Sequence, residues 1–248
     1  EAALRAIMPV RVTNTNEVRR CTMLYPSFTA IARAVKSPLA LIEIGPSAGL
    51  NLNFDHYQYL YSAPGSAETA CGDLSSALVL PCEARGGTRP PLDPRAPAIA
   101  RRVGLELNPV DVASEADRRW LKALIWPGPV EGMARIEAAL KIAQAHPPRI
   151  VPGDAVGNLA AAVAETPIGA HATVFHSFVT YQFPTALREK LDATFAALSA
   201  ERTLSRLAIE WDGKDYPIVH TVYRGGKADA RTLALCDPHG AWLEWKAS

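Results

Sequence analysis

Residues 39–51 read LALIEIGPSAGLN, and this stretch decides the fold. Its first six residues are apolar apart from Glu43, and a short apolar run of this kind is typical of a parallel β-strand covered on both faces. Small residues punctuate the next segment, at Gly45, Ser47 and Gly49. We therefore predict a strand, a tight turn and the start of a helix, the arrangement with which open α/β sheets bind ligands beyond their strand ends.

Each residue of this turn has an expected role, although a plain strand-to-helix turn is the alternative. Gly45 permits the sharp bend, Ser47 or its backbone lets a ligand approach, and Gly49 lets the helix pack on the sheet. The carboxylate of Glu43 suits a cation, such as the ammonium of a methionyl group, whereas a dinucleotide fold directs a helix N-terminus at pyrophosphate. Asn51 either lines the methionyl end of such a cofactor or belongs only to the first helical turn.

Outward from this motif, the chain alternates strands and helices up to about residue 210 and then continues as strands alone. Alternation predicts a doubly wound, mostly parallel sheet, and the tail predicts an antiparallel edge on it. After 39–44, the predicted strands are 103–107, 149–151, 172–179, 204–211, 217–223, 232–236 and 241–245. The predicted helices begin near Ser114, Met133, Val156 and Pro184.

The N-terminal part of the chain reads as helix. The pattern predicts a break at Pro26 and a second helical piece that Ser27 caps and that ends at Val35. We expect a single α/β domain over residues 1–248, with a helical N-terminal segment over residues 1–36.

Residues from about 57 to 100 differ in character from the rest. Apolar alternation gives way to glycines and to five prolines between Pro81 and Pro97. This composition predicts a β-hairpin or small antiparallel flap followed by an irregular loop. We expect it to be an insertion over the site.

Charge and composition exclude several classes of partner. The formal net charge is +1 over 248 residues, so nothing indicates a nucleic-acid partner, for which a basic face and a pI above ~9 are usual. No apolar run approaches the ~20 residues of a membrane span, and no signal peptide is visible. The cysteines form no close pair, which favours reduced thiols in a cytoplasmic protein over a Cys71–Cys82 disulfide or a zinc site. A small-molecule substrate and no metal are expected.

Polar side chains also mark the ends of the next two strands. Glu106 and Asn108 end the second strand, and the carboxylate of Glu106 can accept both hydroxyl protons of a ribose, unless it is only a solvated loop residue. Asp154 follows the third strand and can accept from an adenine amino group, with Ala155 leaving room for the ring. Asp154 is equally suited to cap the next helix, and the two roles are compatible.

Three residues are candidates for the reacting end. His176 follows a buried strand, and an ordinary histidine pKa near ~6.5 suits a general base that removes a proton from a substrate. Tyr181 is the second candidate and His239, in a turn between terminal strands, is the third. The alternatives are a histidine bonded to backbone, a tyrosine packed in the core and a simple turn histidine.

Together these residues resemble class I S-adenosylmethionine-dependent methyltransferases. More closely, the chain resembles the bacterial family called domain of unknown function 2332, through EIGPSAGLNL at 43–52, LNPVD at 107–111, WLKA at 120–123, GDA at 153–155, FHS at 175–177 and PHGAW at 238–242. Within residues 16–21, Arg and Cys stand where small residues are usual in that family, so the helix there is expected to pack differently. Glu106 stands where aspartate is commoner in that family, and its longer side chain extends the reach of the carboxylate.

The resemblance implies a Rossmann-like sheet with a reversed last hairpin and an S-adenosylmethionine site, but no established reaction. It implies a cofactor cradle at Glu43, Gly45, Ser47 and Gly49. It also implies a ribose contact at Glu106 and an adenine-side contact at Asp154.

Three functions remain as hypotheses. The first is a methyltransferase acting on a small molecule, and the second is a non-catalytic adenosyl-cofactor-binding protein. The third is a different enzyme on a Rossmann-like sheet, either a hydrolase or a nicotinamide oxidoreductase. The hydrolase reading rests on the G-x-S-x-G pattern around Ser47 and on Asp237-Pro238-His239 downstream.

Overall fold

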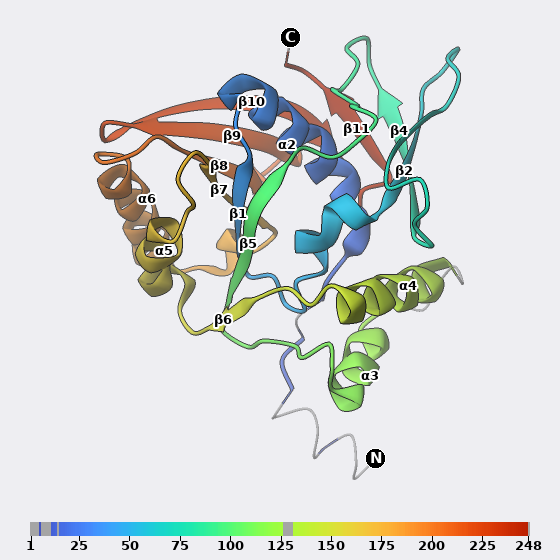
Figure 1. The fold of residues 1–248 in the computed structure, drawn as a ribbon, viewed down its shortest axis with the longest axis horizontal. Coiled ribbons are helices and arrows are strands. Elements are labelled where there is room, and N and C mark those ends of the chain that lie inside the picture. The colour runs from blue at the N-terminus through green and yellow to red at the C-terminus, as the bar shows by residue number, and fades with distance from the viewer. Residues whose placement is uncertain (1–4, 6–10, 14, 126–130, 248) are drawn as a thin grey trace.

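The computed structural model describes residues 5, 11–13, 15–125 and 131–247 (Figure 1), so most of the expected N-terminal helix before residue 11 lies outside the described residues. The described strands are β1 (Leu39–Ile44), β2 (Gln58–Ser62), β3 (Thr69–Gly72), β4 (Val79–Arg85), β5 (Ile99–Glu106), β6 (Ile150–Pro152), β7 (His171–Ser177), β8 (Leu204–Ile209), β9 (Pro217–Arg224), β10 (Lys227–Cys236) and β11 (Trp242–Trp245). They form one sheet in the order β3-β2-β4-β11-β10-β9-β8-β7-β1-β5-β6.

The sheet is mixed, as the sequence predicts. From β6 to β8 every neighbouring pair is parallel, with β1 between β5 and β7. The pairs β8–β9, β9–β10 and β10–β11 are antiparallel because short connections join these consecutive strands. The α/β class and the antiparallel C-terminal strands are therefore confirmed.

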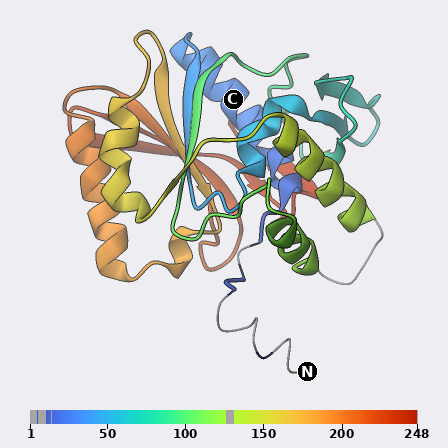
Figure 2. The same ribbon diagram turned by 60° about the horizontal axis from the view of Figure 1, so that its bottom comes forward.

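Helices cover both faces of the parallel half (Figures 1 and 2). The helices of the described residues are η1 (Val18–Arg20), α2 (Cys21–Val35), η2 (Leu50–His56), α3 (Glu115–Ala123), α4 (Glu131–Ala145), α5 (Ala155–Ala164), η3 (Thr180–Gln182) and α6 (Thr185–Leu198), and α3 lies beside α4, away from the sheet. Leu39 and Leu41 of β1 belong to the core shared with α2, η2 and α4, whereas Ile42 and Ile44 pack in the core under α5 and α6. The continuous apolar run of β1 reflects burial on both faces.

Residues 57–100 are not a flap. The expected hairpin exists as β2 and β3, but β2 also pairs in parallel with β4, and β4 pairs in parallel with β11, so all three strands extend the main sheet. Tyr57, Tyr59 and Tyr61 are buried and their hydroxyls donate to backbone carbonyls of Leu50, Phe54 and Thr22. These buried aromatic anchors tie the segment to the core.

The expected break at Pro26 is also wrong, because α2 runs through it as one helix. A proline lacks the N–H that would bond the carbonyl four residues earlier, which here belongs to Thr22. Tyr61 Oη donates to that carbonyl oxygen at 2.6 Å and replaces the missing bond. Ser27 does not cap a second helix; its hydroxyl donates to the Met23 carbonyl oxygen at 2.7 Å.

This replacement leads to a test by double-mutant cycle. Tyr61→Phe is expected to lower the free energy of unfolding by about 1–2 kcal/mol, since the Thr22 carbonyl loses its partner in a buried place. In a Pro26→Ala background the loss should be clearly smaller, because the alanine introduced there supplies the helical N–H. Urea unfolding of the four proteins measures the coupling. Tyr57→Phe is the control and should cost the same in both backgrounds; equal costs for Tyr61→Phe would contradict the account.

Candidate functional site

A cleft with a volume of ≈ 540 Å³ lies at the carboxyl ends of the parallel strands. Gly45 and Asn51 reach it from the segment after β1, and residues 177–183 reach it from the segment after β7. Many of the residues singled out from the sequence line it, namely Gly45, Asn51, Glu106, Asn108, Asp154, Ala155 and Tyr181. Parallel strand ends meet at one edge of a sheet, which is why residues so distant in sequence share this cleft.

Glu106 links two backbone segments at the cleft through its carboxylate. Its side chain is buried, and its Oε2 accepts a hydrogen bond from the backbone N–H of Ser47 at 2.7 Å. Its Oε1 accepts from the backbone N–H of Asn108 at 2.9 Å. A carboxylate oxygen has two lone pairs, so each oxygen retains the capacity for one further hydroxyl donor. Glu106 thus joins the turn after β1 to the end of β5 and still has acceptor capacity for a ligand.

Glu43 lies behind the cleft rather than on its surface. It is buried, its Oε1 accepts from Asn51 Nδ2 at 3.3 Å, and its Oε2 is buried with no hydrogen-bond partner. Burial raises the pKa of this carboxyl to about 8, so it is mostly protonated at pH 7. The expectation of a carboxylate at the strand tip therefore changes to a neutral acid that acts through Asn51, itself a lining residue.

The small residues of the turn serve chain packing first. Gly45 and Gly49 have φ of 68° and 72°, and Ser47 has φ of 56°, in the left-handed region that favours glycine. A Cβ at Gly45 would lie 2.8 Å from a Val179 methyl, and one at Gly49 would lie 2.6 Å from Pro148 Cγ. Gly49 and Ser47 do not line the cleft; Ser47 contributes its backbone N–H to Glu106.

Asp154 caps a helix and also lines the cleft. It is the N-cap of α5, where Oδ1 accepts from the Val156 N–H at 3.2 Å and Oδ2 accepts from the Gly157 N–H at 2.8 Å. The helix-cap alternative is therefore confirmed. Asp154 and Ala155 nevertheless line the cleft, so the capping geometry also presents the carboxylate there.

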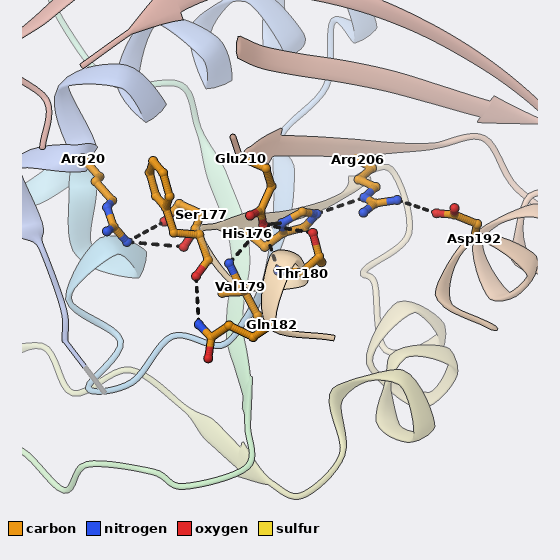
Figure 3. A network of polar contacts seen from close by, with 10 residues as sticks. Arg20, His176, Ser177, Val179, Thr180, Gln182, Asp192, Arg206 and Glu210 are labelled. Atoms are coloured by element: carbon orange, nitrogen blue, oxygen red, sulfur yellow. Dashed lines mark hydrogen bonds and ion pairs between the residues drawn. The ribbon is translucent and has the colours of Figure 1, made fainter. Parts of the chain in front are cut away.

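His176 is enclosed by protein groups instead of facing the cleft (Figure 3). Arg206 Nε donates to its Nε2 at 3.0 Å, so the ring proton resides on Nδ1, which donates to Glu210 Oε1 at 2.7 Å. The ring is fully buried, and burial lowers the pKa of His176. Both nitrogens of this neutral imidazole are occupied, so a substrate proton has no free acceptor here.

The His176 network supports one wall of the cleft. Glu210 Oε1 also accepts from the backbone N–H groups of Val179 and Thr180, at 3.0 and 2.9 Å. Arg206 continues the network to Asp192. Residues 179–183 contribute to the cleft wall, so the histidine and the carboxylate fix its backbone.

The other two reacting-end candidates lie in different cavities. Tyr181 is largely exposed and lines the cleft. His239 lines a second cavity, with its Nδ1 3.9 Å from Glu17 Oε2. Ser47 is buried and lines neither the cleft nor this second cavity, so neither of the two brings together the serine and the histidine of the hydrolase hypothesis.

Comparison with known proteins gives one match. A family model described as "Uncharacterized protein conserved in bacteria (DUF2332)" matches residues 1–245. The chain belongs to the DUF2332 family. No curated protein and no solved structure matches it.

Among the described cleft residues that we did not single out as ligand contacts, Arg20 of this DUF2332 chain is the charged one. Its guanidinium lies 4.4 Å from the centre of the Phe178 ring and donates to Pro238 and Ser177 carbonyl oxygens, both at 3.3 Å (Figure 3 shows the Ser177 contact). Burial lowers its pKa, and no carboxylate of the described residues forms an ion pair with it. The signal in the sequence was an arginine directly before a buried helix.

Three further features of the described part of this DUF2332 protein concern metals, membranes and cysteines. No group of three or more histidine, cysteine, aspartate or glutamate side chains is placed to hold a metal ion there. Within the same residues, no helix combines the length and apolarity that crossing a bilayer requires. All four cysteines are buried free thiols, so the Cys71–Cys82 disulfide is not formed.

Proposed function

We propose that the cleft binds an adenosyl cofactor, S-adenosylmethionine, and that the protein is a methyltransferase-like enzyme acting on a small molecule. One observation carries the proposal: the carboxylate of Glu106, with spare acceptor capacity, shares one cleft with Asp154 and with the glycine turn after β1. A carboxylate after each of two neighbouring parallel strands, together with the glycine turn after the next strand, suits a ligand that has a diol at its middle and a base at one end.

The residues present fit such a cofactor along its whole length. Glu106 would accept from the ribose hydroxyls, and Asp154 beside Ala155 would accept from the adenine amino group. Asn51 would meet the amino-acid end, with Glu43 behind it. The buried Oε2 of Glu43 has no partner, and an unpaired buried polar atom is costly, so a cation close by would favour its ionisation. The cofactor supplies an activated methyl group.

The chain's own residues would bind and orient the two reactants and exclude water. The described lining of the cleft contains Tyr181 but no histidine. An acceptor that is already ionised at neutral pH suits this lining best, because it needs no strong base.

The enclosed position of His176 also favours a second candidate, a non-catalytic adenosyl-cofactor-binding protein. Such a protein keeps the cradle and needs no base. The two candidates differ in turnover: only the enzyme converts S-adenosylmethionine to S-adenosylhomocysteine when an acceptor is present.

Ligand-induced stabilisation is the first test. S-adenosylmethionine and S-adenosylhomocysteine are each expected to raise the melting temperature, since a ligand at ~100 times its dissociation constant adds about 2.7 kcal/mol to the stability of the folded state. Differential scanning fluorimetry measures the shift, and NAD is the control that should leave the melting temperature unchanged. If neither sulfur compound shifts the melting temperature, both candidate functions, the methyltransferase and the cofactor-binding protein, are excluded.

A further inference from the structure

A second cavity, with a volume of ≈ 430 Å³, lies between residues 15–20 and the helices α3 and α4. Its apolar wall comes from these two helices and the residues that follow α3, through Leu121, Leu124, Ile125 and Ile136. A cavity of this size with an apolar wall and a few polar groups is typical of small-molecule sites. The sequence motifs did not indicate it.

The polar lining of this cavity is dominated by cations. Arg20 and Arg135 both line it, and neither takes part in an ion pair among the residues that the structure describes. Glu17 is the acidic residue of the lining, and its Oε1 already accepts the Arg19 backbone N–H at 3.0 Å. Two guanidinium groups against one carboxylate give the described lining a formal net positive charge, so an anion at this place would be stabilised.

The second cavity and the cleft adjoin each other. Thr15, Asn16 and Arg20 line both of them. A molecule whose apolar part lies among the leucine and isoleucine side chains would therefore direct its charged end towards Arg20, at the boundary with the cleft. Arg20 itself is held in place by carbonyl oxygens and by the Phe178 ring.

We propose that this cavity binds a small apolar monocarboxylic acid, with its carboxylate on Arg20 and Arg135 and its apolar body against α3 and α4. The further idea that this cavity holds the methyl acceptor rests on the proposed function. A carboxylate acceptor is ionised at neutral pH and needs no general base, which would explain a cleft lining without histidine. As a binding site it requires no cofactor.

Isothermal titration calorimetry of the full chain with sodium octanoate tests the proposal. Octanoate is expected to bind the wild type, and octanol, which has the same apolar chain without the charge, at least tenfold more weakly. Arg135→Gln should weaken octanoate binding at least tenfold. Arg119→Gln is the matched control, because this arginine lies on the exposed face of α3, paired with Glu115, and should leave binding unchanged.

A cavity-filling variant, Leu124→Trp, gives a second readout and should abolish octanoate binding while circular dichroism shows an unchanged fold. Equal affinity for octanol and octanoate, or undiminished binding by Arg135→Gln, would overturn the proposal. S-adenosylhomocysteine titrated into the same protein separates the two ideas. Binding of octanoate alone would support the carboxylate site and exclude the cofactor proposal. Binding of S-adenosylhomocysteine alone would support the cofactor proposal and exclude the carboxylate site.

Discussion

Glu106→Ala should lower the free energy of unfolding by about 2–4 kcal/mol and abolish the thermal shift with S-adenosylhomocysteine. The carboxylate accepts the backbone N–H groups of Ser47 and Asn108, and its removal takes both of these charge-assisted hydrogen bonds away. An orphaned buried donor costs about 1–3 kcal/mol, and bonds to a charged group are at the upper end. The predicted ribose contact disappears in the same variant.

Glu106→Gln separates the structural effect of Glu106 from its effect on ligand binding. The glutamine amide keeps the side-chain volume and one acceptor oxygen, but its NH₂ group faces a backbone N–H donor and cannot accept from it. About half of the stability loss of Glu106→Ala is therefore expected. Urea unfolding gives the stability, and calorimetry with S-adenosylhomocysteine gives the affinity. A folded Glu106→Ala protein that binds S-adenosylhomocysteine as well as the wild type would exclude Glu106 from the site.

Glu43→Gln should make the protein more stable at neutral pH and remove a large pH dependence. The pKa of Glu43 is raised from the ordinary 4.5 to about 8 by burial, so between these values the folded state binds more protons than the unfolded state. Stability from this group is then fully present below pH 4.5 and falls as the pH rises towards 8. The loss is about 1.4 kcal/mol per pH unit inside this window, or on the order of 3 kcal/mol between pH 5 and pH 7.

The measurement is urea unfolding of both proteins at pH 5, 6, 7 and 8. The stability difference between Glu43→Gln and the wild type should grow with pH, because glutamine does not titrate. Glu115→Gln, on the exposed face of α3, is the control and should show no such growth. A constant difference across the range would mean that Glu43 is ionised in the folded protein. Weaker S-adenosylmethionine binding by the more stable variant would show that Glu43 is kept for function at a cost in stability.

The strand and cap predictions succeeded where a local pattern is sufficient. The apolar run at 39–44 became β1, and Ser114 caps α3 by accepting from the Asp117 N–H, as its position before an apolar stripe predicts. The failures arose where a distant partner changes a local preference. Pro26 breaks no helix because Tyr61 satisfies the carbonyl that the proline leaves free.

The candidate site also has residues whose position the sequence pattern predicts and residues whose state depends on distant partners. Glu106 and Asp154 reach one cleft because the ends of neighbouring parallel strands always share an edge, and that relation is readable from strand order alone. The two nitrogens of His176 are occupied by Arg206 and Glu210, which lie 30 and 34 residues away in the chain. No local pattern around a histidine reveals whether its nitrogens are already occupied.

The amino-acid sequence by itself determined the alternating elements, the glycine turn and the acidic residues at the strand ends, because these depend on backbone preferences and on burial periodicity over a few residues. Only the tertiary structure decided that residues 57–100 extend the sheet, that Glu43 is a buried acid, and that Arg20 joins two cavities. Strand pairing, desolvation and the spacing of charges all depend on which distant segments are brought together, and that is settled when the core packs.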